Sequence, residues 1–130
     1  MLDTNICIYI AKHQPPAVKA RFERLQPGQV VMSAITYGEL HYGAGKSARR
    51  ESALAHLAEL IQDVPVENLD SKAAEAYGEI RATLERHGRV IGNNDLWIGA
   101  HAMALGVTLA TNNEREFKRI AGLSVENWTK

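Results

Sequence analysis

Three carboxylates in this 130-residue sequence, Asp3, Glu39 and Asp95, occupy positions where side chains from separate segments can meet. Asp3 follows a short apolar pair that is typical of a strand end. Glu39 lies about one and a half turns into the helix after the second predicted strand, and Asp95 opens a helix that leads into another strand. The carboxyl ends of parallel strands lie along one edge of a sheet, so we expect the three acids to converge there.

Such a cluster of carboxylates requires a positive charge. Two carboxylates about 4 Å apart repel by about 4 kcal/mol at an effective dielectric constant of about 20, so three would not stay ionised together without a cation. Oxygen ligands without Cys or His suit Mg²⁺ or Mn²⁺ rather than zinc. A site of this kind binds phosphates and generates a hydroxide nucleophile, which predicts hydrolysis of a phosphodiester bond.

The predicted surroundings of two of these acids are apolar. Glu39 shares a helix face with Ile35 and Tyr42, and Asp95 shares one with Ile98. No Lys or Arg is placed locally to neutralise either acid, and burying an unpaired charge is expensive. Simpler interpretations stay open, because Asp3 and Asp95 could each be a helix N-cap and Glu39 could face solvent.

Short apolar strands alternate with amphipathic helices along the chain, which predicts an α/β fold with a central parallel sheet in one domain spanning residues 1–130. Asp70 is expected to cap a long helix, and Pro27-Gly28 a turn. The predicted strands cover 1–2, 29–32, 63–66, 107–111 and 123–126, and the predicted helices cover 4–11, 17–25, 33–42, 49–61, 71–87, 96–105 and 113–120.

The bulk composition restricts the class of protein only loosely. Fifteen basic and fifteen acidic residues give no strong global field, although local patches can still bind nucleic acid. The lone cysteine, Cys7, cannot form an internal disulfide, which suits a reducing compartment. We find no membrane-length apolar run and no signal peptide, so we expect a cytoplasmic protein with no membrane contact.

Four motifs in order resemble the PIN-domain ribonucleases and, within that family, the VapC toxins of bacterial toxin–antitoxin pairs. They are Leu2-Asp3-Thr4-Asn5, the segment SAITYGEL from Ser33 to Leu40, the segment GNNDLWIGAHA from Gly92 to Ala102, and Thr111-Asn112-Asn113. The resemblance spans nearly the whole chain. It implies a PIN-like three-layer α/β/α domain with about five short parallel strands.

The same resemblance implies an endoribonuclease that depends on Mg²⁺ or Mn²⁺, with Asp3, Glu39 and Asp95 as catalytic and metal-binding acids. It further implies a homodimer, a VapB-type antitoxin as partner, and contact with operator DNA only through that antitoxin. The subgroup with Thr-Asn-Asn before the last helix is similar to toxins that cut initiator tRNA in the anticodon loop. That tRNA is the expected RNA substrate.

The fourth acid departs from the pattern. Many PIN domains place an aspartate where this chain has Asn112 and Asn113, and the VapC relatives suggest Glu116 as the additional metal ligand instead. The alternative is a capping box formed by Asn113 and Glu116, which would satisfy backbone donors only. Thr4, Thr111 and Asn113 are expected to orient the carboxylates or water.

The sequence also bears on the roles of the histidines, of Trp97 and of two basic groups. The five histidines lack metal-ligand spacing, and Trp97 suits packing better than base stacking. The basic groups Lys46 with Arg49-Arg50, and Arg115 with Lys118-Arg119, are either solvated faces or contacts for RNA phosphates.

Two other functions compete with the nuclease. A haloacid-dehalogenase-type phosphatase resembles Asp-x-Asp-x-Thr at the first strand, whereas Asp3-Thr4-Asn5 lacks the second acid. A catalytically silent PIN-like module that binds RNA or protein would retain the fold without cleavage.

Overall fold

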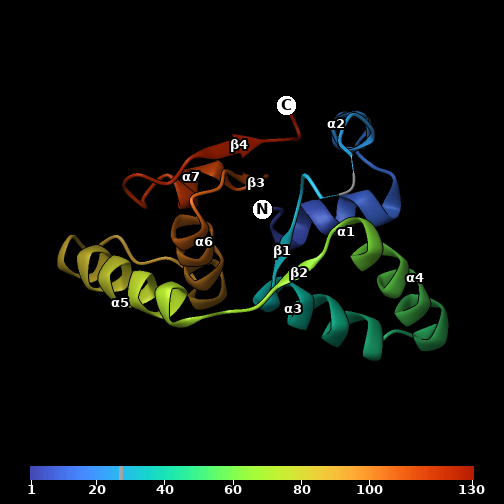
Figure 1. Cartoon of the computed structure of the whole chain (residues 1–130), viewed down its shortest axis with the longest axis horizontal. Coiled ribbons are helices and arrows are strands. Elements are labelled where there is room, and N and C mark those ends of the chain that lie inside the picture. Colours follow the sequence, from blue (N-terminus) through green and yellow to red (C-terminus); the bar gives the residue numbers. More distant parts are fainter. Residues whose placement is uncertain (27) are drawn as a thin grey trace.

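A parallel sheet forms the centre of the computed structural model, which describes residues 1–26 and 28–130 (Figure 1). In spatial order it runs β2, β1, Leu2, β3, β4. Leu2 pairs with Met32 and with Ala110 through single-residue bridges, so the expected first strand is reduced to one residue. The strands are β1 (Met32–Ser33), β2 (Val66–Glu67), β3 (Leu109–Thr111) and β4 (Val125–Asn127).

The strands are shorter than the sequence predicts. Asp63 belongs to the preceding helix, and Pro65 lacks the N–H that a ladder needs, so pairing in β2 begins only at Val66. Val107 donates its N–H to Ala102 O, which ties it to the end of the preceding helix rather than to β3. The predicted turn at Pro27-Gly28 falls partly on residue 27, outside the described residues.

Three of the helices begin where a side chain accepts one of their first free N–H groups. Ser33 caps its helix by accepting from Ile35 N, and Asp70 caps the longest helix by accepting from Ala73 N, as predicted. Gly106 ends another in the left-handed conformation, with φ 68°. The helices are α1 (Thr4–Lys12), α2 (Pro16–Glu23), α3 (Ala34–Gly45), α4 (Arg50–Asp63), α5 (Ser71–Arg86), α6 (Asn93–Leu105) and α7 (Glu114–Phe117).

Three helix boundaries differ from the prediction by three residues. α3 continues to Gly45 rather than ending at residue 42. α6 begins at Asn93, three residues before the expected start, because Leu96 N already donates to Gly92 O. α7 ends at Phe117 rather than at Ile120, where the chain closes in a tight turn from Ile120 N to Phe117 O. None of the helices within residues 1–26 and 28–130 has the length and apolar character needed to cross a membrane.

Side chains of the sheet alternate between two apolar cores, as the two-residue period of a strand requires. Leu2 and Met32 enter a core shared with α1, α2 and α4. Met1 and Leu109 enter a second core, shared with α5, α6 and α7. Figure 1 shows these helices on opposite sides of the sheet, which gives the expected three layers.

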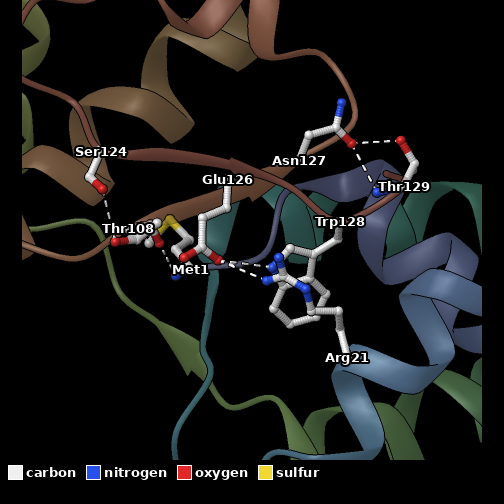
Figure 2. A network of polar contacts seen from close by, with 8 residues as sticks. All are labelled: Met1, Arg21, Thr108, Ser124, Glu126, Asn127, Trp128 and Thr129. Carbon is white, nitrogen blue, oxygen red and sulfur yellow. Dashed lines mark hydrogen bonds and ion pairs between the residues drawn. The ribbon is translucent and has the colours of Figure 1, made fainter.

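Strand β4 is fastened to α2 by a polar network, which we call the β4 network (Figure 2). Glu126 Oε2 accepts hydrogen bonds from Arg21 Nη1 at 3.3 Å and from Trp128 Nε1 at 3.2 Å. The Arg21 guanidinium also lies over the Trp128 ring, 5.8 Å from its centroid. The carboxylate on this side of the sheet therefore has both a cation and a neutral donor.

Candidate active site

Asp3 lies buried directly after Leu2, at the carboxyl edge of the sheet. Its Oδ1 accepts from Ile6 N at 3.0 Å, and its Oδ2 accepts from the Thr111 hydroxyl at the end of β3. The N-cap interpretation of Asp3 is therefore correct as geometry, and the second oxygen is fixed as well. Burial raises the pKa of Asp3, the hydrogen bonds from Thr111 and Ile6 oppose that rise, and the charge of Glu39 adds to it.

Glu39 points from α3 toward the N-terminus of α1. Thr4 donates its hydroxyl to Glu39 Oε1 at 2.6 Å, and the same hydroxyl lies 3.2 Å from the Thr36 hydroxyl. Glu39 itself is half-buried, so the solvent-facing interpretation is wrong. The predicted apolar packing beside Tyr42 is wrong, because Tyr42 is 68% exposed although it follows Glu39 on the same side of the helix. Leu40 and Glu39 both line a cavity.

The start of α3 is held in place by a buried pair that the sequence did not single out. Ser33 Oγ caps the helix and lies 2.8 Å from Nδ1 of His101, whose side chain is 1% exposed. His101 belongs to α6, so the pair joins the helix of Glu39 to the helix of Asp95. This is the satisfied core histidine that the spacing of the histidines favours.

Asp95 is the third residue of α6 and is half-buried. The N-cap of this helix is Gly92, and no side chain caps it, so the N-cap interpretation of Asp95 is wrong. The pKa of Asp95 is raised to about 6, first by burial and then by the negative charges of Glu116, Asp3 and Glu39. Those three charges act on Asp95 because the fold brings all four carboxylates to one region.

Glu116 joins α7 to the start of α6. Its Oε1 accepts from Gly92 N at 3.1 Å, and its Oε2 accepts from Asn113 Nδ2 at 2.7 Å. Asn113 N donates to Thr111 Oγ1 at 2.9 Å rather than to Glu116, so the predicted capping box is not formed. The residue that sequence analysis missed here is Gly92, whose N–H lies 24 positions away and leaves no pattern in the sequence.

Asn112 does not join the acids. Its Nδ2 donates to the Tyr9 hydroxyl at 3.1 Å, and its Oδ1 accepts from Asn5 Nδ2 at 3.2 Å. Both contacts are to α1. Of the two asparagines that replace the usual aspartate, only Asn113 therefore contacts a carboxylate of the site.

The four carboxylates have no cationic partner within residues 1–26 and 28–130, where every ion pair lies elsewhere. Three of them are bound by neutral donors, and no three His, Cys, Asp or Glu side chains in this part of the chain are already arranged to hold a metal ion. Drawing the carboxylates together would increase their repulsion, which a divalent cation offsets. An all-oxygen donor set of this charge fits Mg²⁺ or Mn²⁺.

Comparison with known proteins gives independent evidence on the family. Residues 1–123 match the PIN domain family. The tRNA(fMet)-specific endonuclease VapC of Shigella flexneri is 43% identical over 129 residues, which cover 99% of this chain and 97% of that protein.

Two solved structures are also similar over nearly their whole length. VapBC-1 of nontypeable Haemophilus influenzae has a TM-score of 0.91 and 43% identity, covering 100% of this chain and 98% of that one. VapBC2 of Rickettsia felis, bound to a promoter DNA fragment, has a TM-score of 0.91 and 40% identity, covering 98% and 97%. The chain therefore belongs to the PIN-domain family and, within it, to the VapC ribonucleases.

Proposed function

We propose that this chain is the toxin of a type II toxin–antitoxin pair and hydrolyses phosphodiester bonds of initiator tRNA in the anticodon loop. The observation that carries the proposal is the group of four carboxylates that have no cationic partner among the described residues, in a chain 43% identical to a tRNA(fMet)-specific endonuclease. We further propose that residues 1–130 act as one PIN domain in the cytoplasm, where the tRNA is found.

In this proposal Asp3, Glu39 and Asp95 bind Mg²⁺ or Mn²⁺, and Glu116 completes the acidic site. A divalent ion bound there supplies a hydroxide nucleophile and stabilises the leaving oxygen. Thr4 and Thr111 keep Glu39 and Asp3 in place through their hydroxyl groups, and Asn113 keeps Glu116 in place through its amide. These neutral donors leave the negative charge of the site intact.

An apolar cavity that Glu39 helps to line offers a binding surface for an inhibitory partner. A cavity of about 400 Å³ lies between α1, α3 and α4, lined mainly by apolar groups such as Ile8, Leu40 and Leu57, with Glu39 at its border. We propose that a VapB-type antitoxin fills it and brings a basic side chain to Asp3, Glu39 and Asp95. We also propose that the chain acts as a homodimer and meets operator DNA only through the antitoxin; the similar VapBC2 of Rickettsia felis is bound to a DNA fragment from its promoter.

The two competing functions stand differently. The phosphatase pattern needs a second aspartate two residues after the first, and Asn5 occupies that position. The silent binding module is the alternative that an experiment must separate from the nuclease.

The test is cleavage of purified tRNAs, including initiator tRNA, with Mg²⁺ or Mn²⁺, with EDTA, and with the Asp95→Asn protein. Glu126→Gln is the matched control, because it removes a carboxylate of the β4 network. We expect one cut in the anticodon loop of initiator tRNA, lost with EDTA and Asp95→Asn but kept by Glu126→Gln. RNA binding without cleavage under either metal would support the silent module, and cleavage that survives Asp95→Asn would overturn the site assignment.

A further inference from the structure

Tyr42 on α3 is the most exposed large hydrophobic side chain among the described residues, at 68%. Isolated exposed apolar residues are common, so the exposure alone indicates nothing. The position of Tyr42 is more informative. Glu39, Tyr42 and Lys46 follow the spacing i, i+3, i+7, which places them along one stripe of the helix that starts at the acidic site.

A cation already accompanies the Tyr42 ring. Lys46 Nζ lies 4.8 Å from the ring centroid, within the range of a cation–π interaction, which restrains both side chains. Lys46, Arg49 and Arg50 form no ion pair within the described part of the chain. An exposed aromatic ring next to unpaired cations is the combination that binds single-stranded RNA, in which bases stack and phosphates require positive charge.

In the second basic group predicted from the sequence, Lys118 and Arg119 are already engaged within the protein, whereas Arg115 is exposed. Lys118 pairs with Glu114 at 3.6 Å, and Arg119 Nη1 donates to Val90 O at 2.8 Å. Trp97 is stacked on Tyr77, with ring centroids 3.8 Å apart and an interplanar angle of 11°. Its ring therefore packs within the protein, as expected, and Tyr42 is the aromatic side chain open to an RNA base.

The two faces of α3 that meet at Glu39 differ in chemistry. Leu40, Gly43 and Ala44 line the apolar cavity, whereas Tyr42 and Lys46 lie on the exposed stripe. We propose that this stripe, extended by Arg49 and Arg50, binds the RNA substrate beside the cleavage site, a role that rests on the proposed nuclease function. Tyr42 stacks on an unpaired base of the anticodon loop, and the three cations bind the adjoining phosphates.

The test measures binding of a fluorescein-labelled anticodon stem-loop of initiator tRNA by fluorescence anisotropy, in EDTA so that no cleavage occurs. Loss of one base–aromatic stack predicts that Tyr42→Ala weakens binding about 5- to 150-fold, and Tyr42→Phe, which keeps the ring, restores it to within about twofold. Lys46→Ala should lower the slope of log affinity against log salt by about 0.7, the value for one phosphate contact in single-stranded nucleic acid.

Lys19→Ala on α2 is the matched control, because Lys19 pairs with Glu23 away from α3 and should leave the salt slope unchanged. Circular dichroism checks that each variant is folded. If wild-type protein cleaves the tRNA but Tyr42→Ala binds the stem-loop as tightly as wild type, the RNA stripe is wrong and the nuclease function stands. If Tyr42→Ala weakens only the antitoxin complex, Tyr42 is a protein contact and the inference is likewise overturned. If wild-type protein neither binds nor cleaves RNA, both proposals fail.

Discussion

Glu126 and Asp95 are both carboxylates beside the same sheet, but the fold surrounds them differently. Glu126 has Arg21 and the Trp128 indole as partners (Figure 2). Asp95 has no hydrogen-bond donor of its own among the described contacts, and its nearest charges are other carboxylates. The first arrangement fastens β4 to α2, whereas the second keeps negative charge unbalanced. Unbalanced charge is costly to stability, and it marks the place where a cation has most to gain.

The largest difference between Asp95 and Glu126 should appear in the rate of RNA cleavage. Asp95→Asn removes a negative charge that we assign to the metal site, and we expect cleavage of initiator tRNA to slow by about 100-fold or more. Glu126→Gln should stay within about twofold of wild type. Initial cleavage rates at equal protein and metal concentrations measure both. A large loss of cleavage rate with Glu126→Gln would show that Glu126 and Asp95 are not functionally distinct.

The next largest difference should be in stability, when a hydroxyl group is removed at the acidic site or near β4. The Thr111 hydroxyl is buried between Asp3 and Asn113 N, so Thr111→Val leaves unsatisfied partners and should lower the free energy of unfolding by about 1–3 kcal/mol. The Thr108 hydroxyl contacts Ser124 at an exposed position before β4, and Thr108→Val should change the free energy of unfolding by less than about 0.5 kcal/mol. Urea denaturation distinguishes the two. Equal effects would mean that Thr111 has no special role.

The pH dependence of stability tests the unbalanced charge directly. The pKa of Asp95 is about 6 in the folded protein and about 3.9 in an unfolded chain, so ionisation disfavours the folded state. The stability associated with Asp95 is therefore present below about pH 4 and is lost as pH rises through about 6. Because Asp95 is only half-buried and screened by solvent, we expect it to contribute a gain of about 1 kcal/mol from pH 7 to pH 5, and Asp95→Asn should gain less than wild type by this amount.

The smallest expected effect belongs to the paired carboxylate. Arg21 and Glu126 are 41% and 51% exposed, and exposed ion pairs contribute about 0.2–1 kcal/mol. Glu126→Gln should lower the free energy of unfolding by this amount, and high salt should reduce the difference. Thermal denaturation at low and high ionic strength measures it. A stabilised Glu126→Gln protein would remove the contrast with Asp95.

Much of this fold could be predicted from local signals. Asp70 as a cap, Gly106 as a helix end and the alternation of helices with short strands all depend on neighbours in the sequence. The strand bounds were less predictable, since pairing depends on partners far along the chain. Pro65 shifts the start of β2, and Leu2 pairs through single-residue bridges only.

The candidate site was predictable in its acids but not in their contacts. Asp3, Glu39 and Asp95 could be selected because each lies near a strand end or on an apolar helix face. The contact between Glu116 and Gly92 N requires α7 and the start of α6 to meet in space, which no local pattern reports. The exposure of Tyr42 depends on the rotation of α3 about its axis, and a small error in that rotation moves a residue from the core to the surface.

The most direct test of the contrast between Asp95 and Glu126 is calorimetric titration of Mn²⁺, and then Mg²⁺, into metal-free protein at pH 7. Wild-type protein, Asp95→Asn and Glu126→Gln would be compared at equal concentration. We predict that wild-type protein and Glu126→Gln bind the ion with the same affinity, and that Asp95→Asn binds at least about tenfold more weakly. Equal affinity in all three proteins, or no binding to wild-type protein, would contradict the assignment of the four carboxylates as a cation site.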